Sequence, residues 1–169
     1  GNPEIDFRIK YGKKLVKYPF CADFFDIEKR LLRIFGNKLM NSCLYINIFE
    51  NGVNLSGWFG NPVYYNEYNC NKFLYVNNKI VKDFYIDNVI NYAYFYIDNK
   101  FICNFYCLYI NVDFSLIDMS FYKSECKILF LCDNFIYDLL KKSIISLFSK
   151  KYINVNNIDN LVGKKFFLK

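Results

Sequence analysis

Histidine is absent from this chain of 169 residues. Without it, the chain can form neither a Ser-His-Asp triad nor a Cys–His pair, and zinc sites that contain histidine are excluded. The seven glycines are scattered rather than gathered into a phosphate-binding loop, and Ser56 lies in an expected strand with no histidine to activate it. We therefore expect no catalytic residue, metal site or cofactor in this chain, and no enzymatic activity of its own.

Long hydrophobic runs are missing as well. The longest uncharged apolar stretch, 101–112, has 12 residues and includes two asparagines, whereas a membrane-spanning helix needs about 20 apolar residues. The first ten residues carry charges and no apolar core, so we expect no signal peptide there. The composition is 54% hydrophobic and 22% charged, which favours a soluble, globular domain with a real core and no membrane partner.

The cysteines do not suggest a disulfide framework. There are seven, an odd number, and no two of them form a C-x-x-C pair. Most lie in apolar runs, where a free cysteine behaves as a small hydrophobic residue. This usage favours a reduced, intracellular protein.

Basic residues exceed acidic residues by six, and the excess is local. Residues 1–140 contain 15 of each kind, whereas residues 141–169 contain seven lysines and a single acid, Asp159. Lys141 and Lys142 begin this basic cluster. The cluster suits a polyanion such as a nucleic acid, and it is equally typical of a solvated helix face with a soluble tail.

Apolar periodicity predicts an α+β fold. The expected elements, in chain order, are strands at 5–10 and 15–18, a helix at 24–35, strands at 44–50, 53–59, 73–76 and 80–81, a helix from 83 to about 96, strands at 101–112 and 127–131, and a helix from 135 to about 149. The almost continuous apolar content of 101–112 predicts a strand buried on both faces.

Turn and cap residues set the boundaries of these elements. Asn51-Gly52 is a strong hairpin signal, and Asn77-Asn78 can adopt the left-handed conformation of a tight turn. Asp23, Asp83 and Asp133 are placed to cap the three helices, and Gly36 is placed to end the first.

Five motifs, in chain order, carry a resemblance to a known family. They are KKLV at 13–16 with YP at 18–19 and FG at 35–36, NLSGWFGNP at 54–62, KFLYVNNKIVKD at 72–83, DFSLIDMS at 113–120, and ILF at 128–130 with YD at 137–138. In order and spacing they resemble the second domain of the MutL-type mismatch-repair ATPases, over about residues 5–150.

This resemblance implies a small twisted, mostly antiparallel sheet with helices packed on one face, as in transducer domains and in domain 2 of a ribosomal protein. It also implies a fragment that has no activity alone. In the parent protein such a domain follows a GHKL-type ATPase domain that uses ATP and Mg²⁺. There it relays ATP-driven dimerisation with another MutL-type subunit and lines a groove for duplex DNA.

The resemblance also indicates site residues. Lys79 falls on a basic position of the 72–83 motif and Lys82 on a second one three residues later, so both are expected to face DNA. Two ammonium groups beside a turn can pair with phosphates without reading bases. Lys141 and Lys142 are further candidates, although all four could be ordinary exposed lysines.

One segment departs from the family pattern. Where the family has a V-H-P-x-K motif whose lysine reaches the ATP γ-phosphate, this chain reads FYKSE at 121–125, with Glu125 in place of the lysine. A carboxylate would repel a phosphate. Either Lys123 or Lys127 takes over the contact through a shifted loop, or nucleotide sensing has disappeared.

Three alternatives stay open. A type II topoisomerase transducer domain would carry a Gln-x-Lys loop, and the chain contains no glutamine. An RNA-binding, ribosomal-like module would use the C-terminal lysines. A protein-interaction domain would bind no nucleic acid.

The expected organisation is a transducer domain at 1–150 followed by a basic tail or linker at 151–169. The location is expected to be intracellular, and nuclear if the source is eukaryotic.

Overall fold

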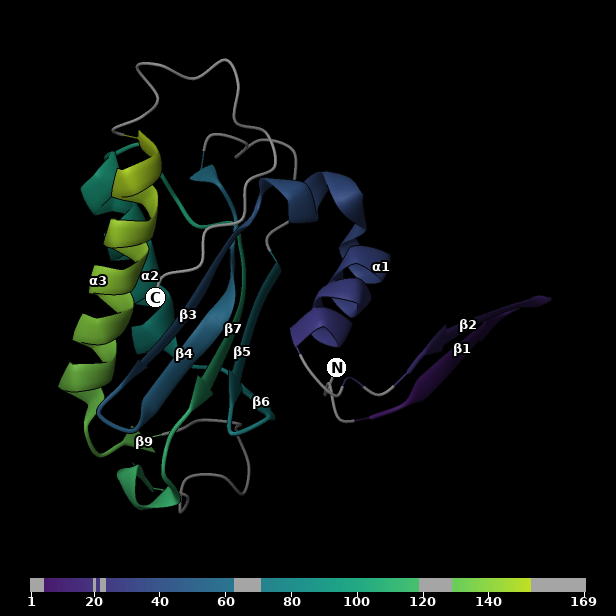
Figure 1. Cartoon of the computed structure of the whole chain (residues 1–169), viewed down its shortest axis with the longest axis horizontal. Helices are drawn as coiled ribbons and strands as arrows, with labels where there is room; N and C mark the ends of the chain where they lie inside the picture. The colour runs from purple at the N-terminus through teal and green to yellow at the C-terminus, as the bar shows by residue number, and fades with distance from the viewer. Residues whose placement is uncertain (1–4, 20, 22–23, 63–70, 119–128, 153–169) are drawn as a thin grey trace. The chain divides into compact units, whose positions relative to one another are not determined.

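The computed structural model describes residues 5–19, 21, 24–62, 71–118 and 129–152 (Figure 1). The chain divides into two compact units, Gly1–Asn41 and Ser42–Lys169. Each is described by itself below. The expected cap Asp23 lies outside the described residues, as does the expected tail at 151–169 except for its first two residues, which belong to the last helix.

The N-terminal unit consists of a hairpin and a helix. Strand β1 (Phe7–Tyr11) pairs with β2 (Lys14–Tyr18) in antiparallel register, and Gly12 turns the chain with a φ of 55°. Helix α1 (Phe24–Ser42) is broken at Gly36, whose φ is 82°. The break confirms the predicted stop, but the helix resumes after it because the following turn buries Leu39 and Met40.

The second unit is built on a five-stranded sheet with the order β3-β4-β7-β5-β6. Its strands are β3 (Leu44–Glu50), β4 (Val53–Phe59), β5 (Asn71–Val76), β6 (Lys79–Val81) and β7 (Phe105–Asn111). Every neighbouring pair is antiparallel except β5 with β7, which is parallel. A short 3-10 turn, η2 (Phe114–Leu116), leads to a two-stranded pair of β8 (Ile117–Asp118) and β9 (Leu129–Phe130).

Helices α2 (Phe84–Ile97) and α3 (Asp133–Tyr152) lie side by side against one face of this sheet (Figure 1). The two helices bury their apolar faces into a single core with the strands. The inward side chains from α3 include Ile136, Leu140, Ile144 and Phe148, and those from α2 include Ile86, Ile90 and Tyr94. This arrangement confirms the predicted α+β fold, with a mostly antiparallel sheet and helices on one face.

A glycine brings the two central strands close together. A side chain on Gly57 of β4 would place its Cβ 2.4 Å from the carbonyl oxygen of Cys107 on β7. A real Cβ does not approach a backbone oxygen so closely, so only glycine fits. Close packing of β4 against β7 therefore explains why the 54–62 motif has glycine at position 57.

Aromatic pairs occupy the sheet face that points away from α2 and α3. Tyr45 lies opposite Trp58 with ring centroids 4.8 Å apart. Tyr75 and Tyr109, which are paired across the parallel strands, stack at 4.7 Å and 9°. Such cross-strand aromatic pairs stabilise a sheet and fix its register.

The predicted strand at 101–112 was too long at its beginning. Strand β7 starts only at Phe105, because the segment before it forms a turn in which the Phe101 amide donates to the carbonyl of Asp98 at 2.8 Å. Every residue of β7 except the last is buried, which confirms that both faces of the strand are covered. Within the described residues, no helix is long and apolar enough to cross a membrane.

Candidate nucleic-acid interface

The turn between β5 and β6 is held in a fixed position. Asn77 and Asn78 both have positive φ, 45° and 64°, which is the requirement of the type I′ turns that join hairpin strands. The Asn77 side chain accepts a hydrogen bond from the amide of Val112 and donates one to its carbonyl, both at 3.0 Å. These two bonds fasten the turn to the end of β7, so the hairpin has little freedom to move relative to the sheet.

Two predicted site residues lie directly after this turn. Lys79 begins β6, which is the outer strand of the sheet, and Lys82 follows the last residue of that strand. Both side chains are exposed. We call these two residues the β6 edge. They are about 10 Å apart along the chain, since a strand rises about 3.3 Å per residue.

The start of α2 lies beside the β6 edge. Asp83 caps the helix, with its carboxylate accepting a hydrogen bond from the amide of Ile86 at 2.9 Å, as predicted. The unpaired amides of a helix N-terminus carry a partial positive charge, which favours an anion nearby. As the cap, the negatively charged Asp83 carboxylate already offsets part of this positive charge.

Asp87, the second acid near the start of α2, forms an ion pair that the sequence pattern did not reveal. Lys72 on β5 contacts Asp87 on α2, with Nζ 2.8 Å from Oδ1 and 3.1 Å from Oδ2. Both side chains are roughly one-quarter to one-third exposed (27% and 30%). Because Asp87 is paired in this way, it opposes the charge of Lys79 and Lys82 less than a free carboxylate would.

The candidates on α3 differ from each other. Lys141 is half-buried, and its Nζ lies 4.5 Å from the centre of the Tyr92 ring on α2, in a cation–π contact. Lys142 is exposed. Of these two candidates, Lys142 is therefore the more accessible to a ligand.

Helices α2 and α3 run in the same direction and begin at the same end of the sheet. Tyr92 contacts Lys141 and Tyr94 packs against Phe148, so later residues of one helix meet later residues of the other. At the shared start, burial and the charges of Asp83 and Asp133 raise the pKa of Tyr137 to about 12. Lys141 lies one helical turn, about 6 Å, beyond Tyr137. Lys141 and its contact Tyr92 therefore lie along the middle of the helix pair, about two and a half helical turns from Asp83, the cap that follows Lys82.

Lys123 and Lys127, the candidates for a contact with ATP, lie outside the described residues. In the described part of the chain, no group of three or more acidic residues or cysteines could hold a metal ion. Burial raises the pKa of the Cys43, Cys103 and Cys107 thiols to about 12, so these cysteines are neutral rather than nucleophilic. The five described cysteines form no disulfide.

The comparison with protein families decides the relationship. Residues 31–149 match the family described as "DNA mismatch repair protein, C-terminal domain", which covers more than two thirds of the chain. The chain belongs to the MutL-type DNA mismatch repair proteins. The match extends from the middle of α1 to the end of α3 and so includes the whole five-stranded sheet and the β6 edge.

Curated relatives agree with this assignment. The chain is similar to the DNA mismatch repair protein MutL of Histophilus somni, at 25% identity over 92% of this chain and 25% of that protein. It is 32% identical to MutL of Actinobacillus succinogenes over 56% of this chain and 15% of that protein. MutL of Yersinia pestis is 23% identical over 88% of this chain and 23% of its own length. The chain therefore spans about a quarter or less of each of these MutL-type relatives.

A solved structure shares the fold. The crystal structure described as the N-terminal domain of a DNA repair protein superposes with a TM-score of 0.64, at 17% identity. The superposition covers 91% of this chain and 51% of that one. This chain and that structure therefore share a fold.

Proposed function

We propose that this chain is the transducer domain of a MutL-type protein and that its β6 edge contacts duplex DNA through the phosphates. The observation that carries the proposal is the fixed hairpin. Asn77 fastens the turn to Val112, so Lys79 and Lys82 are held exposed on a rigid edge rather than on a mobile loop. Contacts from lysine to phosphate position a protein on DNA without reading its sequence.

In the proposal, the α3 lysines add a second group of positive charges on the same unit of the chain. Lys142 is exposed and contributes a long-range charge, whereas the Lys141 ammonium group is already engaged with Tyr92. We therefore rank Lys142 above Lys141 as a DNA contact.

The proposed role within the parent protein is to relay movement. The chain spans only about a quarter of its curated relatives, so ATP and Mg²⁺ would be bound by a GHKL-type domain in another part of the parent, and a second MutL-type subunit would complete a dimer. Lys123 or Lys127 stays the candidate for a contact with that ATP. The boundary between a domain at 1–150 and a tail at 151–169 also stays a prediction. A protein that acts on chromosomal DNA works inside the cell, and in the nucleus if the source is eukaryotic.

Binding of a short duplex to the full chain, measured against salt, tests the DNA contact. We expect the double variant Lys79→Gln/Lys82→Gln to weaken binding and to reduce the slope of log K against log salt by about 0.9 for each phosphate that the protein no longer neutralises. Each single variant should reduce the slope by about half as much as the double variant.

Lys100→Gln provides a matched control. Lys100 is exposed and lies beyond the far end of α2, so its replacement changes the net charge by the same amount as either single variant. An equal effect of all three single variants would show that only net charge matters and would contradict the proposed edge. Preference for a structured RNA over the duplex in competition would favour the RNA-binding alternative instead.

The relay is tested in the intact parent protein by hydrogen exchange. Addition of a non-hydrolysable ATP analogue with Mg²⁺ is expected to change the exchange of amides in β5, β6 and α2. Unchanged exchange throughout Leu44–Tyr152, under conditions where the analogue is bound, would contradict a relay through this domain.

A further inference from the structure

The β1–β2 hairpin of the N-terminal unit carries charge of one sign only. Its twelve residues, 7–18, include five basic side chains and no acidic one. The basic residues are Arg8, Lys10, Lys13, Lys14 and Lys17. All five are exposed, and none has an ion-pair partner among the residues that the structure describes.

The register places these charges against one another. Arg8 lies directly opposite Lys17, and the turn brings Lys13 next to Lys14. Like charges that face each other across a strand pair are destabilising. A ribbon that keeps this arrangement without internal acids is suited to an external polyanion, which would remove the repulsion.

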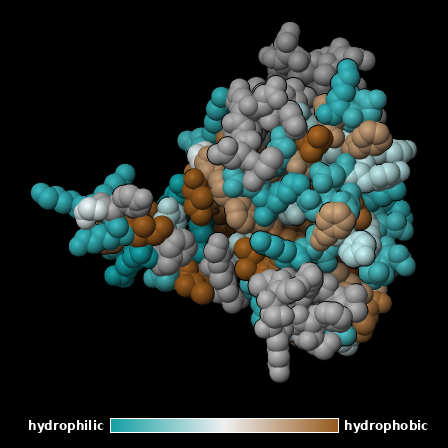
Figure 2. Space-filling model, turned by 180° about the vertical axis from the view of Figure 1, so that it is seen from behind, coloured by the Kyte–Doolittle hydropathy of each residue, from teal (hydrophilic) through white to brown (hydrophobic). Residues whose placement is uncertain are grey.

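The shape of the ribbon also fits a nucleic acid. Within the described residues, the two strands pair only with each other, and most of their described side chains are exposed. In the space-filling view the ribbon is mainly hydrophilic, with a few apolar side chains between the charges (Figure 2). From Arg8 to Tyr11, where the turn begins, it extends about 10 Å. A two-stranded ribbon of this kind fits the major groove of B-DNA, which is about 12 Å wide, where its basic side chains reach phosphates on both sides.

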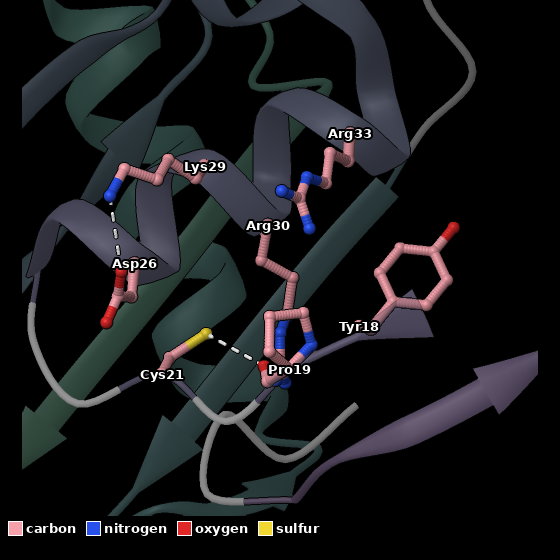
Figure 3. A pocket seen from close by; sticks show the side chains of 7 residues that line it. All are labelled: Tyr18, Pro19, Cys21, Asp26, Lys29, Arg30 and Arg33. Carbon is pink, nitrogen blue, oxygen red and sulfur yellow. Dashed lines mark hydrogen bonds and ion pairs between the residues drawn. The ribbon is translucent and has the colours of Figure 1, made fainter. Parts of the chain in front are cut away.

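A buried arginine fixes the base of the ribbon. Arg30 on α1 is only 7% exposed, and its guanidinium donates hydrogen bonds to the carbonyl of Ile5, at 3.1 Å, and to that of Pro19 (Figure 3). Ile5 precedes β1 and Pro19 follows β2, so a single side chain holds both ends of the hairpin against the helix. The ribbon is thereby anchored at its base while its turn stays exposed.

More positive charge lies next to this anchor. A pocket of about 180 Å³ beside Arg30 is also lined by Lys29 and Arg33 (Figure 3). Lys29 is 3.4 Å from Asp26, whereas Arg33 is exposed and has no ion-pair partner within the described residues. Arg33 thus continues the basic surface from the ribbon onto α1.

We propose that the β1–β2 hairpin is an arm that binds the sugar-phosphate backbone of duplex DNA, independently of the β6 edge. The inference goes beyond the proposed function, because the arm belongs to a different unit of the chain and lies outside the 31–149 family match. Its contacts are electrostatic and therefore tolerate any base sequence.

The test uses the full chain with Lys10, Lys13 and Lys14 all replaced by glutamine. We expect the slope of log K against log salt for a 20-base-pair duplex to decrease by about 0.9 for each phosphate that the arm no longer neutralises, and affinity at low salt to fall roughly tenfold or more. The matched control replaces the same three lysines by arginine, which keeps the charge and should bind like the unmodified chain. All three side chains are exposed, and unchanged near-ultraviolet circular dichroism will confirm that both variants fold.

The outcomes separate the arm from the β6 edge. If the hairpin variant lowers the slope while Lys79→Gln/Lys82→Gln does not, the arm is supported and the proposed function of the β6 edge falls. If the hairpin variant keeps the slope and affinity of the unmodified chain, the arm is overturned whatever the β6 edge does. Because Ile9 and Leu15 are 43% and 50% exposed, vesicles containing phosphatidylserine are the second probe. Hairpin-dependent binding to these vesicles without binding to the duplex would also overturn the arm.

Discussion

The hairpins β1–β2 and β5–β6 present lysines in opposite ways. Both reverse the chain through residues with a positive φ, at Gly12 in the first and at Asn77 and Asn78 in the second. In the part of the chain that the structure describes, the first pairs with no third strand, and Arg30 holds its base. The second is paired to β7 along the whole of β5 and fastened at its turn by Asn77.

This difference shows that local turn chemistry does not decide whether a basic hairpin is rigid. A third strand and one side-chain amide fasten β5–β6, and β1–β2 has neither among the described residues. A fixed edge can set the orientation of a bound duplex, whereas a ribbon anchored at its base can follow the groove. In the proposals above, β5–β6 would orient the bound duplex and β1–β2 would extend the contact along the groove.

Disrupting the sheet that holds β5–β6 should have the largest effect. In Gly57→Ala, the new Cβ would meet the Cys107 carbonyl, which is backbone and cannot rotate away. We expect the free energy of unfolding of the second unit to fall by about 3 kcal/mol, as measured by urea denaturation. Hydrogen exchange in β5 should then approach that in β1–β2.

Ser56→Ala is the control for this prediction, because Ser56 is the preceding residue of the same strand. It should change the stability by less than about 1 kcal/mol. Equal decreases for the two variants would mean that the close approach of β4 and β7 is not what requires glycine.

Removing the side-chain fastening of the second hairpin should have the next largest effect. Asn77→Ala removes two hydrogen bonds to Val112, and Asn51→Ala serves as its reference because Asn51 occupies the same left-handed region, with φ of 47° against 45°. Each hydrogen bond contributes about 1 kcal/mol, so Asn77→Ala should be about 2 kcal/mol less stable than Asn51→Ala. Equal urea midpoints for the two variants would contradict the fastening.

A hydrogen bond at the far end of β4 should affect stability without loosening the hairpin. The buried Tyr94 hydroxyl donates to the carbonyl of Gly60 at 2.7 Å. Tyr94→Phe leaves that carbonyl unsatisfied and should reduce stability by about 1–2 kcal/mol, while exchange at the β5–β6 turn stays as in the unmodified chain. Tyr96→Phe, at an exposed position, should lie within about 0.5 kcal/mol of the unmodified chain.

The smallest effect should come from pH, and it should be confined to the second unit. Burial raises the pKa of the Cys103 and Cys107 thiols from 9.0 to about 12, whereas β1–β2 contains no thiol. Above about pH 9 the unfolded chain releases protons that the folded chain keeps, so stability should decline as the pH rises from about 9 towards 12 and should not change on this account below 9.

Urea midpoints at pH 8 and pH 10.5 measure this decline. Cys107→Ala should reduce the difference between the two midpoints without abolishing it, because the raised pKa of Tyr137, about 12, acts in the same direction. A midpoint that rises with pH over this interval would show that the thiols are not neutral in the folded protein.

The sequence predicted elements best where their signals are local. Strands β3 and β4 have the predicted bounds because Asn51-Gly52 allows one register only, and α2 begins at its predicted cap, Asp83. The strand predicted from 101 failed at its beginning because apolar content reports burial rather than conformation. Cys103 is fully buried, yet it lies before the strand.

Much of the candidate site depends on contacts between distant elements. Lys79 and Lys82 could be placed from the turn signal, but the Lys72–Asp87 pair and the contact of Lys141 with Tyr92 depend on how α2 packs, which no local pattern encodes. The basic hairpin β1–β2 is not apparent in the sequence for another reason. Counting charge over residues 1–140 gives zero and conceals five basic residues on one hairpin, which a count for each element would have found.

The anchoring by Arg30 has a consequence for how this protein can vary. Arg30 binds the residues just before β1 and just after β2. The length of the hairpin can therefore change without changing its attachment to helix α1. Inserting or deleting two residues in each strand, on either side of Gly12, would lengthen or shorten the hairpin. Each remaining side chain would stay on the same face of the hairpin, because side chains alternate between the two faces with a period of two residues. Related chains can therefore differ in the length of this hairpin while helix α1 and its arginine stay the same.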